Sequence, residues 1–259
     1  MELHFEVAGQ GEPLVILHGL FGSLENWRPM SKRLAQHFRV FALDQRNHGL
    51  SPHSFEMDYL LMAKDVRDFL GAQGLNDCMV LGHSMGGKTA MQLALSYPGS
   101  VRKLVVADMS PRADAGRHEK IIAAMRSLDL PRYETRKEIE TSLGTAVPDL
   151  STRRFLLKNV ARRPVGGFSW KVGLEQIHQN YPNLTKAIDG EAPFTKPALF
   201  IRGEESDYLT QADWPSILRL FPKAALQTIP GAGHLVHVEN PEAFFTTVVN
   251  FFTEAGLSS

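Results

Sequence analysis

Short apolar runs alternate with longer amphipathic stretches along this 259-residue chain, and this alternation restricts the possible folds more than any other feature. Apolar runs of three to five residues are typical of strands that are covered on both faces. We predict such strands at 14–17, 40–43, 79–81, 104–107, 198–201 and 225–229, and a half-buried strand over the alternating residues 2–7. Helical periodicity lies between them, at 58–71, 86–96 and 240–255. This order predicts an α/β fold with a mostly parallel sheet and helices on both faces.

The alternation is interrupted between Met109 and Lys196, where we expect no buried strand. Proline and glycine separate helix-like patterns at 116–128, 132–143, 150–161 and 174–179. We therefore predict a helical cap, residues 109–196, inserted into a core made of residues 1–108 and 197–259.

Charge is balanced over the whole chain but not within it. The sequence has 28 basic and 28 acidic residues, whereas residues 112–190 hold 14 basic and 9 acidic ones, a net charge of +5. Solvated helix faces explain this surplus most simply, and the alternative is a positive rim over a pocket for an anionic substrate. The overall balance provides no field that would recruit nucleic acid or an anionic membrane.

Cysteine, apolar and metal-ligand patterns exclude further classes of protein. Cys78 is the single cysteine, so we expect no internal disulfide and an inert buried thiol. No apolar run approaches the ~20 residues of a membrane span, and the N-terminus lacks the basic and apolar regions of a leader. Histidines and cysteines do not occur at metal-ligand spacing, so we predict no metal and no cofactor. We expect a soluble, cytoplasmic protein.

The sharpest local signal is the pattern Gly-x-Ser-x-Gly centred on Ser84. It follows the apolar strand that ends near Leu81 and precedes a helical run that starts near Gly86. A serine on such a tight strand–turn–helix junction is lifted clear of the sheet, above a helix N-terminus that favours developing negative charge. We predict that Ser84 is a nucleophile; the alternative is an ordinary glycine-rich turn.

A serine nucleophile needs a base, and His234 is the best placed of the ten histidines. It ends a Pro-Gly-Ala-Gly-His loop directly after the last predicted strand, from which it can reach the sheet edge where Ser84 projects. We expect structural roles for four other histidines: His18, His48, His83, which should point away from the serine, and His237 at the start of a helix.

The base in turn needs a carboxylate, and two candidates follow predicted strands. Asp108 ends one apolar run, and Asp207 lies shortly after another. The common hydrolase turn places the acid three residues after Gly203, where Ser206 stands, so Asp207 comes one step late. We therefore favour Asp108 and keep Asp207 as the alternative.

Two backbone N–H groups are needed to bind the oxyanion that forms during acyl transfer. The residue after the nucleophile, Met85, should provide one. The glycine-containing turn after the first buried strand should provide the other, from Leu20 or, as the alternative, Phe21.

These segments together resemble the α/β-hydrolases. The stretches 18–23, 46–52, 82–90 and 108–111 are similar, in the same order, to a subfamily of small bacterial acyl esterases and thioesterases that includes a mitochondrial abhydrolase-domain protein. The resemblance implies a mostly parallel, eight-stranded sheet with helices on both faces and a helical cap after the strand that ends at Asp108. It also implies that Asp108 is the acid.

The resemblance further implies hydrolysis of short to medium acyl carboxylic esters through an acyl-enzyme, without a cofactor. The partner is then a small-molecule acyl ester or thioester, and acyl-CoA is an open option because of the positive insertion. Two alternatives remain: a carbon–carbon bond hydrolase on the same triad, and a ligand-sensing or partner-binding module with vestigial hydrolysis. The sequence leaves the oligomeric state open.

Overall fold

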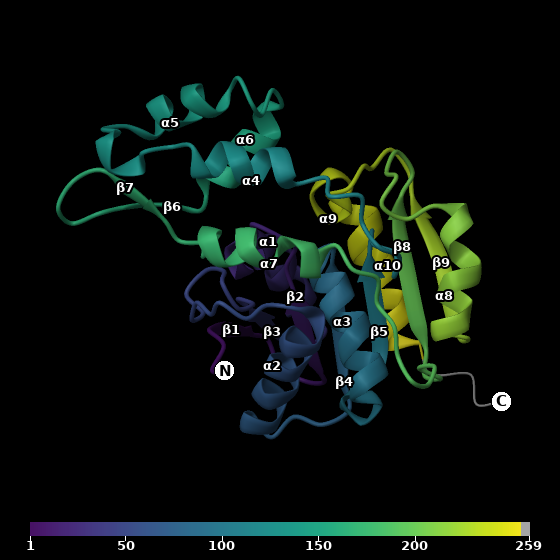
Figure 1. Ribbon diagram of the computed structural model, residues 1–259. Coiled ribbons are helices and arrows are strands. Elements are labelled where there is room, and N and C mark those ends of the chain that lie inside the picture. The colour runs from purple at the N-terminus through teal and green to yellow at the C-terminus, as the bar shows by residue number, and fades with distance from the viewer. Residues whose placement is uncertain (255–259) are drawn as a thin grey trace.

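A seven-stranded sheet forms the centre of the molecule in the computed structural model, which describes residues 1–254 (Figure 1). The strand order is β1-β3-β2-β4-β5-β8-β9, and all neighbouring pairs are parallel except β1 and β3. The strands are β1 (Phe5–Ala8), β2 (Pro13–Leu17), β3 (Arg39–Leu43), β4 (Cys78–His83), β5 (Val101–Ala107), β8 (Ala198–Gly203) and β9 (Ala224–Ile229). The predicted mostly parallel sheet is confirmed.

The sheet has seven strands, so the eight strands that the resemblance implied are wrong. The seven are the six predicted apolar runs and the alternating N-terminal stretch. An eighth strand would have to pair with β1 or β9, the two edges of the sheet. Within residues 1–254 no segment does so, and residues 1–4 form no strand.

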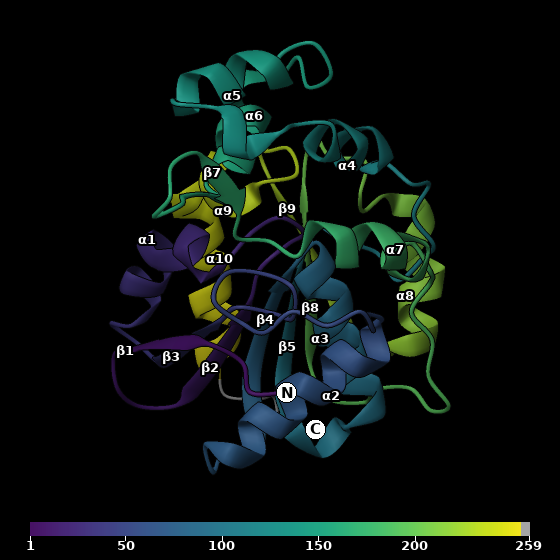
Figure 2. The same cartoon turned by 60° about the vertical axis from the view of Figure 1, so that its left-hand side comes forward.

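Helices cover both faces of this sheet (Figure 2). α1 and α10 share an apolar cluster with one face, through side chains such as Trp27 and Phe244. α2, α3 and α8 share the larger cluster with the other face, through side chains such as Val66 and Ala90. The core helices are α1 (Leu24–Leu34), α2 (Tyr59–Ala72), α3 (Met85–Ser96), α8 (Trp214–Leu220), α9 (Val236–Glu239) and α10 (Pro241–Thr253).

Capping residues begin the two longest helices where the sequence predicts. The Asp58 side chain accepts a hydrogen bond from the Leu61 N–H at 2.8 Å, at the start of α2. Asn240 does the same for the Ala243 N–H at 3.2 Å, with Pro241 in the first helical position of α10. Each cap satisfies an N–H that the first helical turn leaves without a backbone partner.

The segment between β5 and β8 lies above the carboxyl ends of the strands (Figure 1). Its elements are α4 (Glu119–Arg126), α5 (Arg136–Leu143), α6 (Leu150–Leu157), β6 (Val160–Arg162), β7 (Phe168–Trp170) and α7 (Leu174–Leu184). The hairpin of β6 and β7 differs from the expectation of helices alone. Strands of three residues are too short for a recognisable alternation. Residues 1–254 also contain three short 3-10 helices. Of these, η2 (Leu130–Arg132) lies in this segment, whereas η1 (Pro98–Ser100) precedes β5 and η3 (Gln211–Asp213) follows β8.

The register of the parallel strands aligns the two loops that follow β4 and β5. His83 pairs with Ala107, and Ala107 pairs with Ile201 in β8. The residues that come next, Ser84 and Asp108, therefore leave the sheet side by side at its carboxyl edge. Ligand sites of open α/β sheets lie at this edge.

None of the helices in residues 1–254 has both the length and the apolar character to cross a bilayer.

Candidate active site

Ser84 occupies a strained turn between β4 and α3. Its backbone has φ 54° and ψ −120°, a conformation that residues other than glycine rarely adopt. The turn requires glycine on both sides of Ser84, because a Cβ at either position would clash with the backbone. A Cβ on Gly82 would lie 2.1 Å from the Gly86 carbonyl oxygen, and a Cβ on Gly86 would lie 2.2 Å from the Leu17 carbonyl oxygen. The turn has the geometry of a nucleophile elbow.

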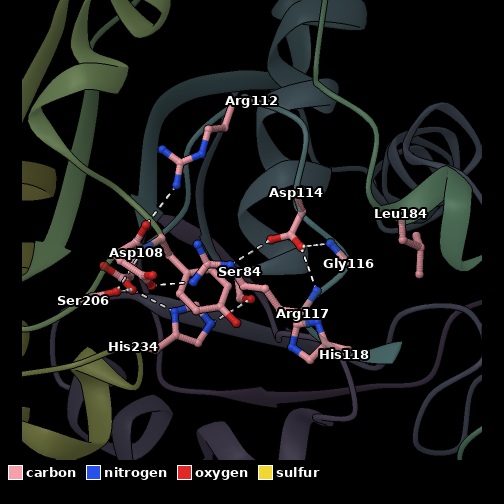
Figure 3. Close-up of polar contacts among 12 residues, drawn as sticks. Ser84, Asp108, Arg112, Asp114, Gly116, Arg117, His118, Leu184, Ser206 and His234 are labelled. Atoms are coloured by element: carbon pink, nitrogen blue, oxygen red, sulfur yellow. Dashed lines mark hydrogen bonds and ion pairs between the residues drawn. The ribbon is translucent and has the colours of Figure 1, made fainter. Parts of the chain in front are cut away.

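The structure brings Ser84, His234 and Asp108 together from three distant parts of the chain (Figure 3). His234 Nε2 lies 3.0 Å from Ser84 Oγ, and His234 Nδ1 lies 2.7 Å from Asp108 Oδ2. The carboxylate thus fixes the imidazole so that Nε2 faces the hydroxyl. This is the arrangement in which a histidine can accept the serine proton.

Asp108 is fully buried and is held from β8 as well as from the histidine. Its Oδ1 accepts a hydrogen bond from the Gly203 N–H at 2.9 Å, and its Oδ2 accepts one from the Ser206 hydroxyl. These donors replace water around a buried charge. In the sequence, Ser206 is distinguished only by its place in the usual acid position, and no pattern indicates its contact with Asp108.

Asp207, the alternative acid, has no contact with His234 among the described residues. Its side chain is 74% exposed and pairs with the guanidinium of Arg117. That pairing lowers the pKa of the Asp207 carboxyl, mainly through the hydrogen bond from Arg117. At this position, one residue after Ser206, the side chain points to the surface.

The two expected oxyanion donors both border Ser84. Met85 begins α3, so its N–H lies in the first turn, where helices leave backbone donors free. Within residues 1–254 the Leu20 N–H donates to no protein acceptor. The Phe21 N–H, in contrast, donates to His48 Nε2 at 3.2 Å and is therefore occupied. The geometry favours Leu20 over Phe21.

His18 and His48 hold the turn that carries Leu20. His18 Nδ1 donates to the Gly19 carbonyl, and its Nε2 accepts from the Gln45 N–H at 3.0 Å. Burial lowers the pKa of His18 to about 4 and that of His48 to about 3. Both rings are therefore neutral near pH 7, and each can donate from one nitrogen and accept on the other.

Two further side chains contact His234 itself. His83 was expected to point away from the site, but its Nε2 donates to the His234 carbonyl at 2.8 Å. The loop after β9 folds back over the end of β4 and makes this contact possible. Tyr208 stacks on the His234 ring with centroids 3.6 Å apart, and the Arg117 guanidinium lies 4.4 Å from the Tyr208 centroid. Nothing in the sequence indicated this stack.

Two cavities meet at Ser84. The outer cleft has a volume of about 580 Å³ and is bordered by the Leu20 turn, α6 and the His234 loop. Phe155 of α6 also lines this cleft. The second cavity, which we call the inner pocket because the buried Lys88 lines it, is smaller, about 30 Å³, and also touches His118 and Tyr181. Residues 1–254 contain no cluster of side chains suited to hold a metal ion.

Comparison with known proteins identifies clear relatives. Residues 12–241 match the model of the alpha/beta hydrolase fold. The chain is 40% identical to the sn-1-specific diacylglycerol lipase ABHD11 of Mus musculus, over 92% of this chain and 80% of that protein. It is 33% identical to Esterase YbfF of Escherichia coli, over 93% of both chains.

A solved structure is similar over almost the whole length. The structure described as a marine microorganism esterase has a TM-score of 0.94 and 44% sequence identity, and the match covers 96% of this chain and 99% of that one.

Proposed function

This chain belongs to the α/β-hydrolase fold family and is a carboxylic ester hydrolase; from that premise we propose that it cleaves acyl esters through an acyl-enzyme on Ser84. The observation that carries the proposal is the pair of distances at His234, 3.0 Å to the Ser84 hydroxyl and 2.7 Å to the Asp108 carboxylate. These are hydrogen-bond distances for a serine, its base and the group that orients the base.

In this mechanism Ser84 Oγ attacks the acyl carbon while His234 Nε2 accepts its proton. The N–H groups of Leu20 and Met85 bind the oxyanion of the tetrahedral intermediate. His234 then protonates the departing alcohol, and the acyl group remains bound to Ser84. A water molecule, deprotonated by His234, releases the acid, and Asp108 stabilises the imidazolium in both halves.

We propose short to medium acyl esters as substrates. The two cavities at Ser84 together have room for such an ester, and residues 109–196 would act as a cap over a core of 1–108 and 197–259. The relatives are named an esterase and a diacylglycerol lipase, which favours ester cleavage over carbon–carbon cleavage on the same triad.

Hydrolysis of p-nitrophenyl esters from acetate to palmitate tests the proposal. Wild type should turn over the shorter esters, and Ser84→Ala should lower kcat by at least about 10⁴. Ser169→Ala, at an exposed position on β7, is the matched control and should retain full activity. Equal activity of wild type and Ser84→Ala would refute the nucleophile. If no ester is hydrolysed and the chain forms a stable complex with a partner protein, the sensing or partner-binding module is favoured.

Acyl-CoA thioesters are a second candidate substrate, favoured by two cationic side chains. Arg154 and Lys158, on and just after α6, line the outer cleft, and they belong to the segment with net charge +5. Phosphate groups bind such side chains. Butyryl-CoA should then be cleaved faster than p-nitrophenyl butyrate at low salt, and the difference should shrink as salt screens the charges.

Arg154→Gln tests the contribution of the Arg154 charge to thioester cleavage. It should slow cleavage of butyryl-CoA by about threefold to tenfold without affecting the neutral ester. Arg132→Gln removes an exposed charge outside the cleft and serves as the control. If thioester cleavage is insensitive to both salt and Arg154→Gln, the CoA candidate is rejected.

A further inference from the structure

Lys88 is a buried cation beside the nucleophile for which the mechanism above has no use. It lies one helical turn after Ser84 on α3, and its residue surface is 1% exposed. Side chains of a helix lean toward its N-terminus, so a residue four positions later leans back toward Ser84. Both Ser84 and Lys88 line the inner pocket.

The charge of Lys88 has no counter-ion in the described part of the chain. Its Nζ donates to the Lys186 carbonyl at 2.8 Å and lies 5.6 Å from the centroid of the Tyr59 ring. An ammonium has three protons, and this carbonyl accepts one of them. Within residues 1–254 no carboxylate comes within 4 Å of Nζ, whereas the buried Arg46 pairs with Asp65 at 2.6 Å.

The nearby acid, Asp114, offsets this charge only in part, because the Arg112 charge opposes it and burial outweighs it. Asp114 also lines the inner pocket, but its Oδ1 accepts hydrogen bonds from the N–H groups of Gly116 and Arg117 (Figure 3). Its other oxygen lies 3.6 Å from the Arg117 guanidinium. An unpaired buried charge is costly, and burial lowers the pKa of Lys88 to about 8. An anion brought by the substrate would relieve this cost.

We propose that the inner pocket is a subsite for a carboxylate at the far end of a short acyl chain, with Lys88 as its counter-ion. This inference rests on the proposed acyl-enzyme at Ser84. The substrate class is then the monoesters of short dicarboxylic acids. The acyl group occupies the narrow inner pocket and stays on Ser84, while the alcohol leaves through the larger outer cleft.

The spacing limits the length of the acyl chain. Four helical residues advance about 6 Å along the axis, so Ser84 and Lys88 lie a short distance apart along α3. One or two methylene groups between the ester carbonyl and the carboxylate match this spacing. Longer dicarboxylic chains should fit less well.

Monoethyl succinate and ethyl 4-oxopentanoate test the subsite, because the second ester replaces the carboxylate by a neutral acetyl group of the same shape. Wild type should have a kcat/KM at least about tenfold higher for monoethyl succinate. Lys88→Met should abolish this preference by slowing the acidic ester at least about tenfold more than the neutral one. Lys120→Met removes an exposed lysine of α4 outside the inner pocket and should keep the preference.

A second measurement uses wild type alone, so it stands even if Lys88→Met fails to fold. Succinate should inhibit hydrolysis of the neutral ester at least about tenfold more strongly than 4-oxopentanoate does. Equal inhibition, or an equal loss on both esters in Lys88→Met, would overturn the subsite. Hydrolysis of neutral esters without a preference refutes the subsite alone, whereas failure to hydrolyse any ester refutes the proposed function.

Discussion

Single residues at the site adopt backbone conformations that ordinary side chains avoid. Five non-glycine residues of the described chain have a positive φ, and three of them, Phe21, Ser84 and Asp108, lie at the site. The surrounding contacts maintain this strain: Phe21 is held through His48, and Asp108 through Gly203. Such strain is concentrated where side-chain direction matters for chemistry.

The role of Asp108 can be measured by removing its charge. Asp108→Asn should lower kcat by up to ~10⁴, because the amide no longer holds His234 in the tautomer that accepts the serine proton. Asp207→Asn is the matched control, since this residue pairs with Arg117 on the surface. Steady-state kinetics on a short acyl ester compares the two. The reverse ranking would contradict the assignment.

His237 should make the fold sensitive to acid. It stacks on Trp27 with ring centroids 4.1 Å apart, and burial lowers its pKa to about 3. In the unfolded chain the pKa of His237 is near 6.5. Between pH 6.5 and pH 3 the unfolded state therefore binds a proton on His237 that the folded state does not bind. The stabilisation by neutral His237 is therefore complete above pH 6.5 and is lost as the pH falls toward 3.

Urea unfolding at pH 7 and pH 5 measures this effect. His237→Phe should reduce the loss of unfolding free energy between these pH values by about 2 kcal/mol. His178→Phe, at an exposed position on α7, should leave the loss unchanged. An unchanged loss in His237→Phe would show that other groups cause the acid sensitivity.

At the scale of elements, the junction of β4 and α3 depends on close contact between the backbone of Gly86, in the first turn of α3, and the backbones of β2 and β4. Its position was predictable because the apolar run, the two glycines and the helical periodicity are all local signals. The same holds for α2 and α10, whose capping residues mark their starts. The β6–β7 hairpin was not predictable, because its pairing is stabilised by packing against the rest of the insertion. Gly167, for example, lies against the Pro131 backbone.

Adding one methyl group to Gly86 should disrupt the junction. The new Cβ would lie 2.2 Å from the Leu17 carbonyl oxygen, so β2 or α3 must shift. Gly86→Ala should lower the free energy of unfolding by about 1–3 kcal/mol or more. Gly71→Ala meets no atom within 4 Å in α2 and should raise it by about 0.5–1 kcal/mol. Equal effects in urea unfolding would contradict this packing argument.

At the scale of the whole molecule, the segment between β5 and β8 contacts the turn that borders Ser84. Asn159, which follows α6, is buried, and its side-chain amide donates to the Phe21 carbonyl at 2.6 Å. This bond joins the insertion to the turn that carries Leu20. The segment between β5 and β8 thus helps to position the turn of the proposed oxyanion donor, Leu20, more than a hundred residues earlier in the sequence.

Asn159→Ala should therefore impair catalysis more than substrate binding. Without the amide, the Phe21 carbonyl loses its partner and the turn moves relative to Ser84. We expect kcat for a short ester to fall by at least about tenfold, with a smaller change in KM. Asn250→Ala, at an exposed position on α10, is the control. A selective rise in KM would show that Asn159 acts on binding instead.

The sequence by itself determined the order of strands and helices, the turn at Ser84 and the loop at His234, because these depend on periodicity and strain within a few residues. Only the tertiary structure decided which carboxylate faces His234, how many strands form the sheet, and what surrounds Lys88. The contacts that assemble the triad join residues far apart in the sequence: 95 positions separate Asp108 from Gly203, and 150 separate Ser84 from His234. Strand register and loop packing set such contacts, and no local pattern encodes them.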